Sequence, residues 1–80
     1  MKTFPLAITD IASTVFEGNA VSVTCPGSAG ELTILAGHMP LVTTLKPGTI
    51  RVKDASGEEH EFPATEGILE VTPKGATILL

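Results

Sequence analysis

The stretch from residue 25 to residue 48 is the feature that most restricts how this chain can fold. Its two short apolar runs are interrupted by glycines and prolines, so it cannot form a helix of ordinary length. Residues 31–34 alternate polar and apolar side chains, which is typical of a half-buried strand, and residues 41–45 form a second candidate strand. Residues 37–40 break the chain between them, because Pro40 lacks a backbone N–H. Turns are predicted at both ends of the stretch, at Pro26-Gly27 and Pro47-Gly48.

The rest of the chain shows the same alternation in short segments separated by turn residues. Gly18-Asn19 predicts a hairpin, and Ser56-Gly57 predicts a further turn. No apolar pattern recurs at helical spacing over three turns. We therefore predict a single all-β domain over residues 1–80, a small β-sandwich or flattened barrel of about nine to ten short strands. The other candidate strands are residues 4–8, 15–17, 20–25, 49–54, 58–64, 67–72 and 76–80.

Composition limits the partners and the stabilising devices open to so short a chain. Nine acidic residues against five basic ones give a net charge of −4, which argues against a nucleic-acid surface. The single cysteine excludes an intramolecular disulfide, and a core of this size rarely contributes more than about 3–5 kcal/mol. The sequence shows no secretory signal, and no apolar run approaches the ~20 residues of a membrane helix. We therefore expect a chain without direct membrane insertion, in a reducing compartment, that a partner subunit stabilises.

The reactive side chains do not suggest an arrangement suited to catalysis. His38 has only Cys25 and Glu31 near it in sequence, and no motif supplies an oxyanion hole or an orienting residue. Cys25 alternates in phase with apolar residues, so we predict a small buried hydrophobe. His60 lies in an acidic run at residues 58–61, where neighbouring strand residues face opposite sides and few could share one ion. We expect no catalytic residue, no cofactor and no metal site, and thus a chain that is not itself an enzyme.

A series of short motifs occurs in one order over nearly the whole chain. They are Gly30-Glu31-Leu32, Gly37-His38, Pro40-Leu41, Pro47-Gly48 and Gly67-Ile68-Leu69-Glu70-Val71. Each motif is common by itself, but the ordered set with this spacing is specific, and it resembles the epsilon subunit of F-type rotary ATP synthases. The resemblance covers the family's N-terminal β-sandwich, whereas the pair of helices that usually follows has no counterpart in this sequence. At Glu66-Gly67 the family commonly shows two glycines, so the turn there is expected to differ slightly.

The resemblance implies a non-catalytic subunit of the central stalk, which is part of the rotor. Such a subunit links the gamma subunit to the membrane ring of c subunits (the c-ring) and couples ion flow to ATP synthesis. It would lie on the cytoplasmic face of the bacterial plasma membrane, or on the inner side of an organelle, as a peripheral part of a hetero-oligomeric complex. The helices carry the family's regulation and, in some members, nucleotide binding, so neither is expected of this sequence. The contacts implied are Asp10, His38, Met39 and Thr43 toward gamma, and Ser28, Glu31 and His60 toward the ring.

Two other functional classes stay open on sequence grounds. The first is a carrier domain of the lipoyl or biotinyl type, which is also acidic, all-β and of about this size, with a modified lysine at a hairpin tip. Lys53 and Lys74 are the candidates, although neither has the flanking residues of those families. The second is a free-standing small-molecule binding module, which needs an apolar cleft. A lipoyl- or biotin-sized addition to the intact mass would favour the carrier.

Overall fold

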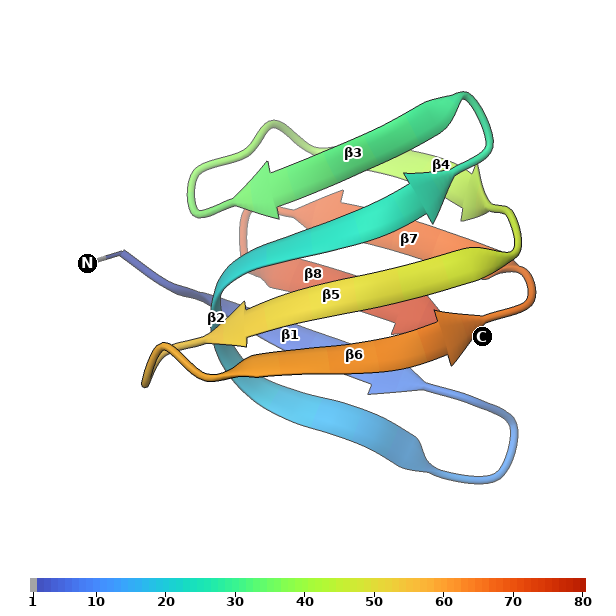
Figure 1. Ribbon diagram of the computed structural model, residues 1–80. Coiled ribbons are helices and arrows are strands. Elements are labelled where there is room, and N and C mark those ends of the chain that lie inside the picture. Colours follow the sequence, from blue (N-terminus) through green and yellow to red (C-terminus); the bar gives the residue numbers. More distant parts are fainter. Residues whose placement is uncertain (1) are drawn as a thin grey trace.

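All regular structure in the computed structural model, which describes residues 2–80, is β-strand (Figure 1). Within this range there is no helix of the length and hydrophobicity needed to cross a membrane. The all-β class is therefore confirmed. The eight strands are β1 (Phe4–Thr9), β2 (Thr14–Gly27), β3 (Gly30–Leu35), β4 (Leu41–Leu45), β5 (Gly48–Asp54), β6 (Glu59–Ala64), β7 (Gly67–Thr72) and β8 (Gly75–Leu79).

The strands form two layers that share β2, the longest strand (Figure 1). The first half of β2 pairs antiparallel with β1, and its second half pairs with β3 and β5. One layer therefore has the order β3-β2-β5-β6, and the other has the order β2-β1-β8-β7-β4. A single pairing of Gly27 with Leu45 connects β2 to β4 and closes the sheet partly into a ring. This arrangement is the small sandwich that the sequence predicted.

The predicted hairpin at Gly18-Asn19 is wrong, because β2 continues through both residues. Gly18 pairs with Leu6 of β1, which holds the chain extended at this point. A two-residue hairpin of the common type needs positive φ at both central residues. Neither residue has it, and the strand count is eight because residues 15–17 and 20–25 belong to one strand. The turn expected at Pro26-Gly27 also lies later, since β2 ends only at Gly27. The residues with positive φ within 2–80 are Gly30, Gly37, Gly57 and Gly75.

β2 bends between the layers at a bulge instead of a turn. Ala20 pairs with Asp54 of β5 and Ser22 pairs with Lys53, which leaves Val21 as one extra residue on β2. The extra residue reverses the alternation of inward and outward side chains. Ala20 is therefore buried and Val21 is only half-buried, whereas alternation from Cys25 backwards placed Val21 inside.

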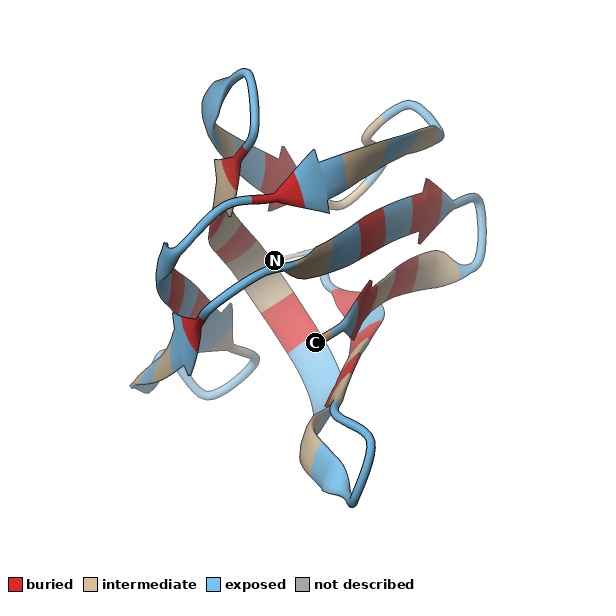
Figure 2. Ribbon diagram, turned by 90° about the vertical axis from the view of Figure 1, so that its right-hand side faces the viewer, coloured by how far each residue is buried: buried red, intermediate tan, exposed pale blue. Residues whose placement is uncertain are grey.

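Side chains between the two layers form one apolar core (Figure 2). Buried and exposed residues alternate along most strands, as the two-residue period of a strand requires. Cys25 belongs to this core, and its burial raises the pKa of the thiol to about 12. Cys25 is therefore the small buried hydrophobe that the sequence predicted. The buried residues are Phe4, Leu6, Ile8, Ala20, Val23, Cys25, Ile34, Leu45, Ile50, Val52, Ala64, Leu69, Val71, Ala76 and Ile78.

Candidate functional site at the two ends of the sandwich

The turns of the sandwich gather at two opposite ends (Figure 1). The end that we call the Glu31 end holds the β1–β2, β2–β3, β4–β5 and β6–β7 turns. The end that we call the His38 end holds the β3–β4 loop and the β5–β6 and β7–β8 turns. The contact residues that the sequence suggested are distributed over both ends, so neither predicted set comes together completely.

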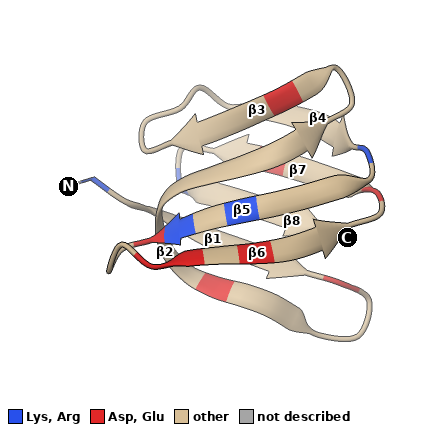
Figure 3. Ribbon diagram, in the orientation of Figure 1, with Lys and Arg blue, Asp and Glu red and all other residues tan. Residues whose placement is uncertain are grey.

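Ser28 and Glu31 lie at the Glu31 end, in and beside the β2–β3 turn. The backbone N–H of Ser28 donates to the carbonyl oxygen of Thr44 over 3.0 Å, and the two hydroxyl oxygens lie 2.8 Å apart. These bonds fix the turn to β4. Glu31 is exposed directly after Gly30, whose φ is +138°. It is the one acidic residue of β3 (Figure 3), and no salt bridge within residues 2–80 involves it. This end therefore presents a solvated carboxylate on a fixed turn.

Asp10 lies at the same end and has a local structural role. Its Oδ1 atom accepts hydrogen bonds from the backbone N–H groups of Ala12 and Ser13, both over 2.8 Å. Its own backbone N–H donates to the carbonyl oxygen of Ser13 over 2.9 Å. These bonds close the β1–β2 turn, as an aspartate at the start of a turn commonly does. Asp10 and His38, which the resemblance grouped together, thus lie at opposite ends of the sandwich.

His38 and Met39 occupy the β3–β4 loop at the His38 end. The backbone N–H of His38 donates to the carbonyl oxygen of Leu35 over 3.1 Å. The ring atom Nδ1 of His38 lies 2.8 Å from the carbonyl oxygen of Met39. The histidine is half-buried, whereas Met39 is 78% exposed. The loop therefore uses His38 to hold its own backbone and presents Met39 to solvent.

β4 turns an apolar side chain toward solvent beside this loop. Thr43 pairs with Leu69 of β7, lies in the inward phase of the strand and is half-buried. Val42 faces outward and is 69% exposed. Ile68 and Leu79, which pair with each other on β7 and β8, lie on the same outer face and are 44% and 52% exposed. Sequence reasoning missed Val42, although the strict alternation between the two leucines of β4 could have revealed it.

His60 lies near the start of β6, at the His38 end and away from Glu31. Its ring stacks on that of Phe62, with centroids 6.4 Å apart and planes within 5° of parallel. It also contacts the ring of Phe16 on β2 at a centroid distance of 5.4 Å. The ring atom Nε2 lies 2.8 Å from Oδ2 of Asp54. His60 therefore helps to close the gap between β6 and the first half of β2, and it does not join Glu31 on one surface.

The β5–β6 turn is built around the carboxylate of Asp54, the last residue of β5. Its Oδ1 atom accepts hydrogen bonds from the Ser56 hydroxyl over 2.6 Å and from the backbone N–H groups of Ser56 and Glu58 over 2.9 and 3.0 Å. The Ser56 hydroxyl first, and then the His60 ring and the two backbone groups, favour the ionised form. They hold the pKa of Asp54 well below its usual range, so the carboxylate is charged at neutral pH.

Replacing Asp54 with asparagine should destabilise the chain by an amount that depends on pH. Because folding lowers the pKa of Asp54, its charge stabilises the native state at any pH above the unfolded value of about 3.9. This contribution is lost as the pH falls below that value toward the lower pKa of the folded chain. The melting temperature of the native chain should exceed that of Asp54→Asn by several degrees at neutral pH, and the difference should shrink below about pH 4.

Thermal unfolding followed by circular dichroism, from about pH 2 to about pH 8, measures this difference across the range set by the two pKa values. Glu59→Gln removes one negative charge from the same hairpin at an exposed position. It should change the free energy of unfolding by no more than about 0.5 kcal/mol at neutral pH. If the difference in melting temperature between the native chain and Asp54→Asn stayed constant with pH, the charge of Asp54 would not stabilise the fold.

Comparison with known proteins identifies a family. Residues 3–80 match the family model described as ATP synthase, Delta/Epsilon chain, beta-sandwich domain. The ATP synthase epsilon chain of Bordetella petrii is 42% identical over 79 residues, which are 99% of this chain and 56% of that protein. The chain therefore spans little more than half the length of this relative.

Solved structures share the fold. A chain in the cryo-EM structure of the Euglena gracilis mitochondrial ATP synthase, OSCP/F1/c-ring, matches with a TM-score of 0.89 at 23% identity, over 96% of this chain and 49% of that one. A chain in the Tetrahymena thermophila mitochondrial ATP synthase, central stalk and c-ring, matches with a TM-score of 0.78 at 15% identity, over 98% of this chain and 63% of that one. Because the family match extends from residue 3 to residue 80, the chain belongs to the ATP synthase delta/epsilon chain family, of which it carries the β-sandwich domain.

Proposed function

We propose that this chain is a non-catalytic subunit of the central stalk of a rotary F-type ATP synthase. In this role it links the gamma subunit to the c-ring and couples ion flow to ATP synthesis. The observation that carries the proposal is the match of residues 3–80 to the β-sandwich domain of ATP synthase delta/epsilon chains. Both ends offer exposed surface. Met39 and Val42 expose apolar side chains beside the His38 end, and Glu31 is a solvated carboxylate at the Glu31 end, where apolar side chains are also exposed at Ile11, Ile68 and Leu79. A stiff two-layer body with a different surface toward each end suits the transmission of torque between two partners.

The surface proposed for the gamma subunit begins at His38 and Met39 and continues onto the outward side of β4 at Val42. Met39 and Val42 are the most exposed apolar side chains at this end of the sandwich. Covering apolar surface favours association by roughly 25 cal/mol per Å², so these side chains would contribute on binding. The backbone N–H and carbonyl of Thr43 point to β7, so its contribution would be smaller. Those of Val42 point to the other side of β4, where the Thr44 carbonyl accepts from Ser28 and β4 reaches β2 only at Leu45. The free part of this edge can accept a partner.

The surface proposed for the c-ring consists of Ser28 and Glu31. A carboxylate in this position can pair with a basic group or accept hydrogen bonds from polar groups on a loop of the ring. The turn that carries it is bonded to Thr44 of β4, two residues from Val42. A load applied at the Glu31 end would therefore pass directly to the strand that carries the proposed gamma surface.

The proposed role makes the chain a peripheral part of the complex, on the cytoplasmic face of the bacterial plasma membrane or on the inner side of an organelle. Of the lysines considered for a carrier domain, Lys53 lies within β5 and not at a hairpin tip. Lys74 does lie in the β7–β8 turn, but the family match over residues 3–80 is to a domain of ATP synthase. The family match therefore outweighs the position of Lys74, and we do not propose a carrier function.

Exchanging Glu31 for lysine should impair coupling while the fold stays intact. The side chain is exposed, so the free energy of unfolding should change by no more than about 0.5 kcal/mol. Like charges placed across a contact cost several kcal/mol, so the association with the ring should weaken by about tenfold or more. ATP-driven ion pumping by an enzyme depleted of its own epsilon subunit, and reconstituted with this chain or with Glu31→Lys, measures the effect.

The matched control is Glu59→Lys, which makes the same charge reversal on an exposed strand residue near the opposite end. It should restore pumping as well as the native chain does. Equal assembly and equal pumping with Glu31→Lys would remove Glu31 from the ring contact. If the native chain itself restored no pumping, the proposed function would fail as a whole.

A further inference from the structure

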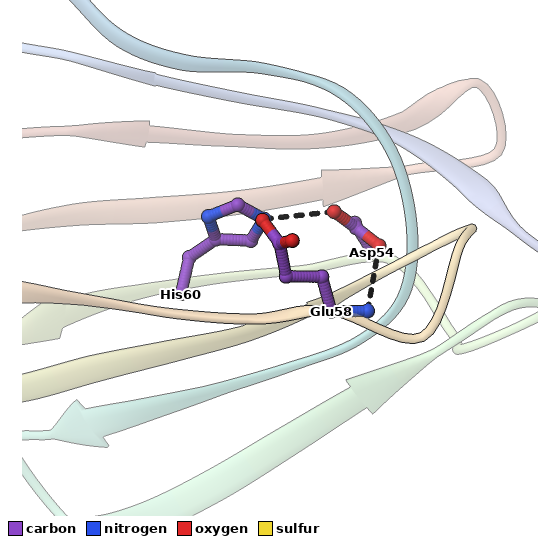
Figure 4. A group of neighbouring side chains, drawn as sticks. All are labelled: Asp54, Glu58 and His60. Atoms are coloured by element: carbon purple, nitrogen blue, oxygen red, sulfur yellow. Dashed lines mark hydrogen bonds and ion pairs between the residues drawn. The ribbon is translucent and has the colours of Figure 1, made fainter.

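Three side chains with metal-ligating atoms converge at the β5–β6 turn (Figure 4). Asp54 ends β5, Glu58 lies in the turn, and His60 is the second residue of β6. One ligand atom from each residue lies within 4.8 Å of the others. The Nε2 atom of His60 is 2.8 Å from Oδ2 of Asp54 and 3.6 Å from Oε1 of Glu58.

The antiparallel register explains why these side chains share one side of the hairpin. Glu58 and His60 are two residues apart and therefore point to the same side, whereas Glu59 and Glu61 point to the other. Asp54 joins them from the neighbouring strand, because its backbone N–H bonds to the carbonyl oxygen of Glu58 over 2.9 Å. In the sequence, this alternation argued against a shared ion. In the structure it turns Glu59 and Glu61 away from the site, and Asp54, Glu58 and His60 are left as a set of three possible ligands.

We propose that Asp54, Glu58 and His60 form a binding site for a divalent transition-metal ion such as Zn²⁺. One imidazole nitrogen and two carboxylate oxygens are ligands that zinc accepts, and water would fill the remaining position. Ligands at about 2.0–2.2 Å from one ion lie roughly 2.8–3.6 Å from each other in tetrahedral or octahedral geometry. The separations of 2.8 and 3.6 Å lie within that range, so small side-chain rotations are enough to seat the ion.

Two of the three ligands are already held in place. The Oδ1 atom of Asp54 is bonded to Ser56 and Glu58, which leaves Oδ2 directed at His60. The His60 ring is packed against Phe16 and Phe62, which also contact each other. Because these groups are already ordered, binding an ion costs little of their conformational entropy. The ion must, however, replace the hydrogen bond between His60 and Asp54. The Glu58 side chain is exposed, so it has room to rotate toward the ion and complete the set.

Isothermal titration of the untagged full chain with ZnCl₂, together with NMR spectra of the two histidine rings, tests the proposal. One saturable site is expected, with shifts at the His60 ring and not at the His38 ring. His60→Gln and Glu58→Gln should each weaken zinc affinity by about tenfold or more, since loss of even an outer-shell partner commonly costs about tenfold. His38→Gln and Glu59→Gln, the matched histidine and glutamate controls, should change affinity less than about twofold.

Glu58→Gln keeps the proposal testable if His60→Gln disturbs the aromatic contacts, because the Glu58 side chain is solvated. A thermal melt of each variant confirms that it is folded before titration. Absence of saturable binding, or equal affinity in the native chain and Glu58→Gln, would overturn the proposal. Loss of binding in His38→Gln would also overturn it. The measurement uses the chain without partners, so its outcome is independent of the function proposed above.

Discussion

Replacing Gly75 with alanine should destabilise the chain by about 3 kcal/mol or more, which is most of the stability expected of a domain of this size. The φ angle at Gly75 is +149°, a conformation that residues with a Cβ atom rarely adopt. An added Cβ would also overlap the carbonyl oxygen of Pro5, a backbone atom that cannot rotate away. Because Leu6 pairs with Ala76 directly beside this point, β1 and β8 would have to separate to make room.

Urea unfolding followed by circular dichroism measures the loss. The matched control is Gly57→Ala, where φ is +91° but no atom lies within 4 Å of the added Cβ. That variant carries backbone strain without a clash, and it should cost about 1–2 kcal/mol. The difference between the two variants isolates the close approach of β1 and β8. Equal losses in the free energy of unfolding in both variants would show that β1 and β8 can separate at this point without a cost in stability.

The strands could be predicted from sequence where apolar alternation and turn residues agree. The bounds of β4 and β7 are those predicted, because glycines and prolines mark them: β4 starts after Pro40 and ends shortly before Pro47, and β7 starts at Gly67 and ends before Pro73. At Gly18-Asn19 the same reasoning gave a wrong prediction. The dipeptide favours a hairpin locally, but pairing with β1 keeps it extended. The register between distant strands depends on contacts that no local pattern contains.

The candidate site could be predicted only in part for the same reason. Glu31 and Met39 are exposed beside turns or loops, where neighbouring glycines and prolines determine the local structure. His60 looked like one member of a solvated acidic run, yet its ring packs on Phe16, more than forty positions earlier in the chain. That contact exists because the first half of β2 returns beside β6. The convergence of His60 with Asp54, in contrast, follows from the register of the β5–β6 hairpin.

Introducing aspartate at Val42 should weaken binding to the gamma subunit by about tenfold or more. Val42 is exposed in the free chain, so a charge there is solvated, but it would face Glu70 of β7 and replace a strand-favouring residue. The free energy of unfolding should therefore fall by about 1 kcal/mol, and the variant should stay folded. In the proposed complex the same position is covered by gamma, and an unpaired carboxylate would lose its water. Removing a neutral polar group from water without a partner costs about 1–3 kcal/mol in proteins, and removing a carboxylate costs more, so a loss of at least about tenfold is expected.

Thr49→Asp is the matched control, because threonine and valine have nearly the same shape and Thr49 is exposed on the outward side of β5 in the other layer. Both variants and the native chain should be titrated against purified gamma subunit by calorimetry, after thermal melts have shown that each is folded. Loss of affinity in Val42→Asp alone would place the contact on β4. Equal affinity in all three chains would exclude β4 from the interface and leave the loop at His38 and Met39 as the remaining proposed contact. A comparable loss in Thr49→Asp would instead mean that gamma covers both layers, and the two-ended division of surfaces would be wrong.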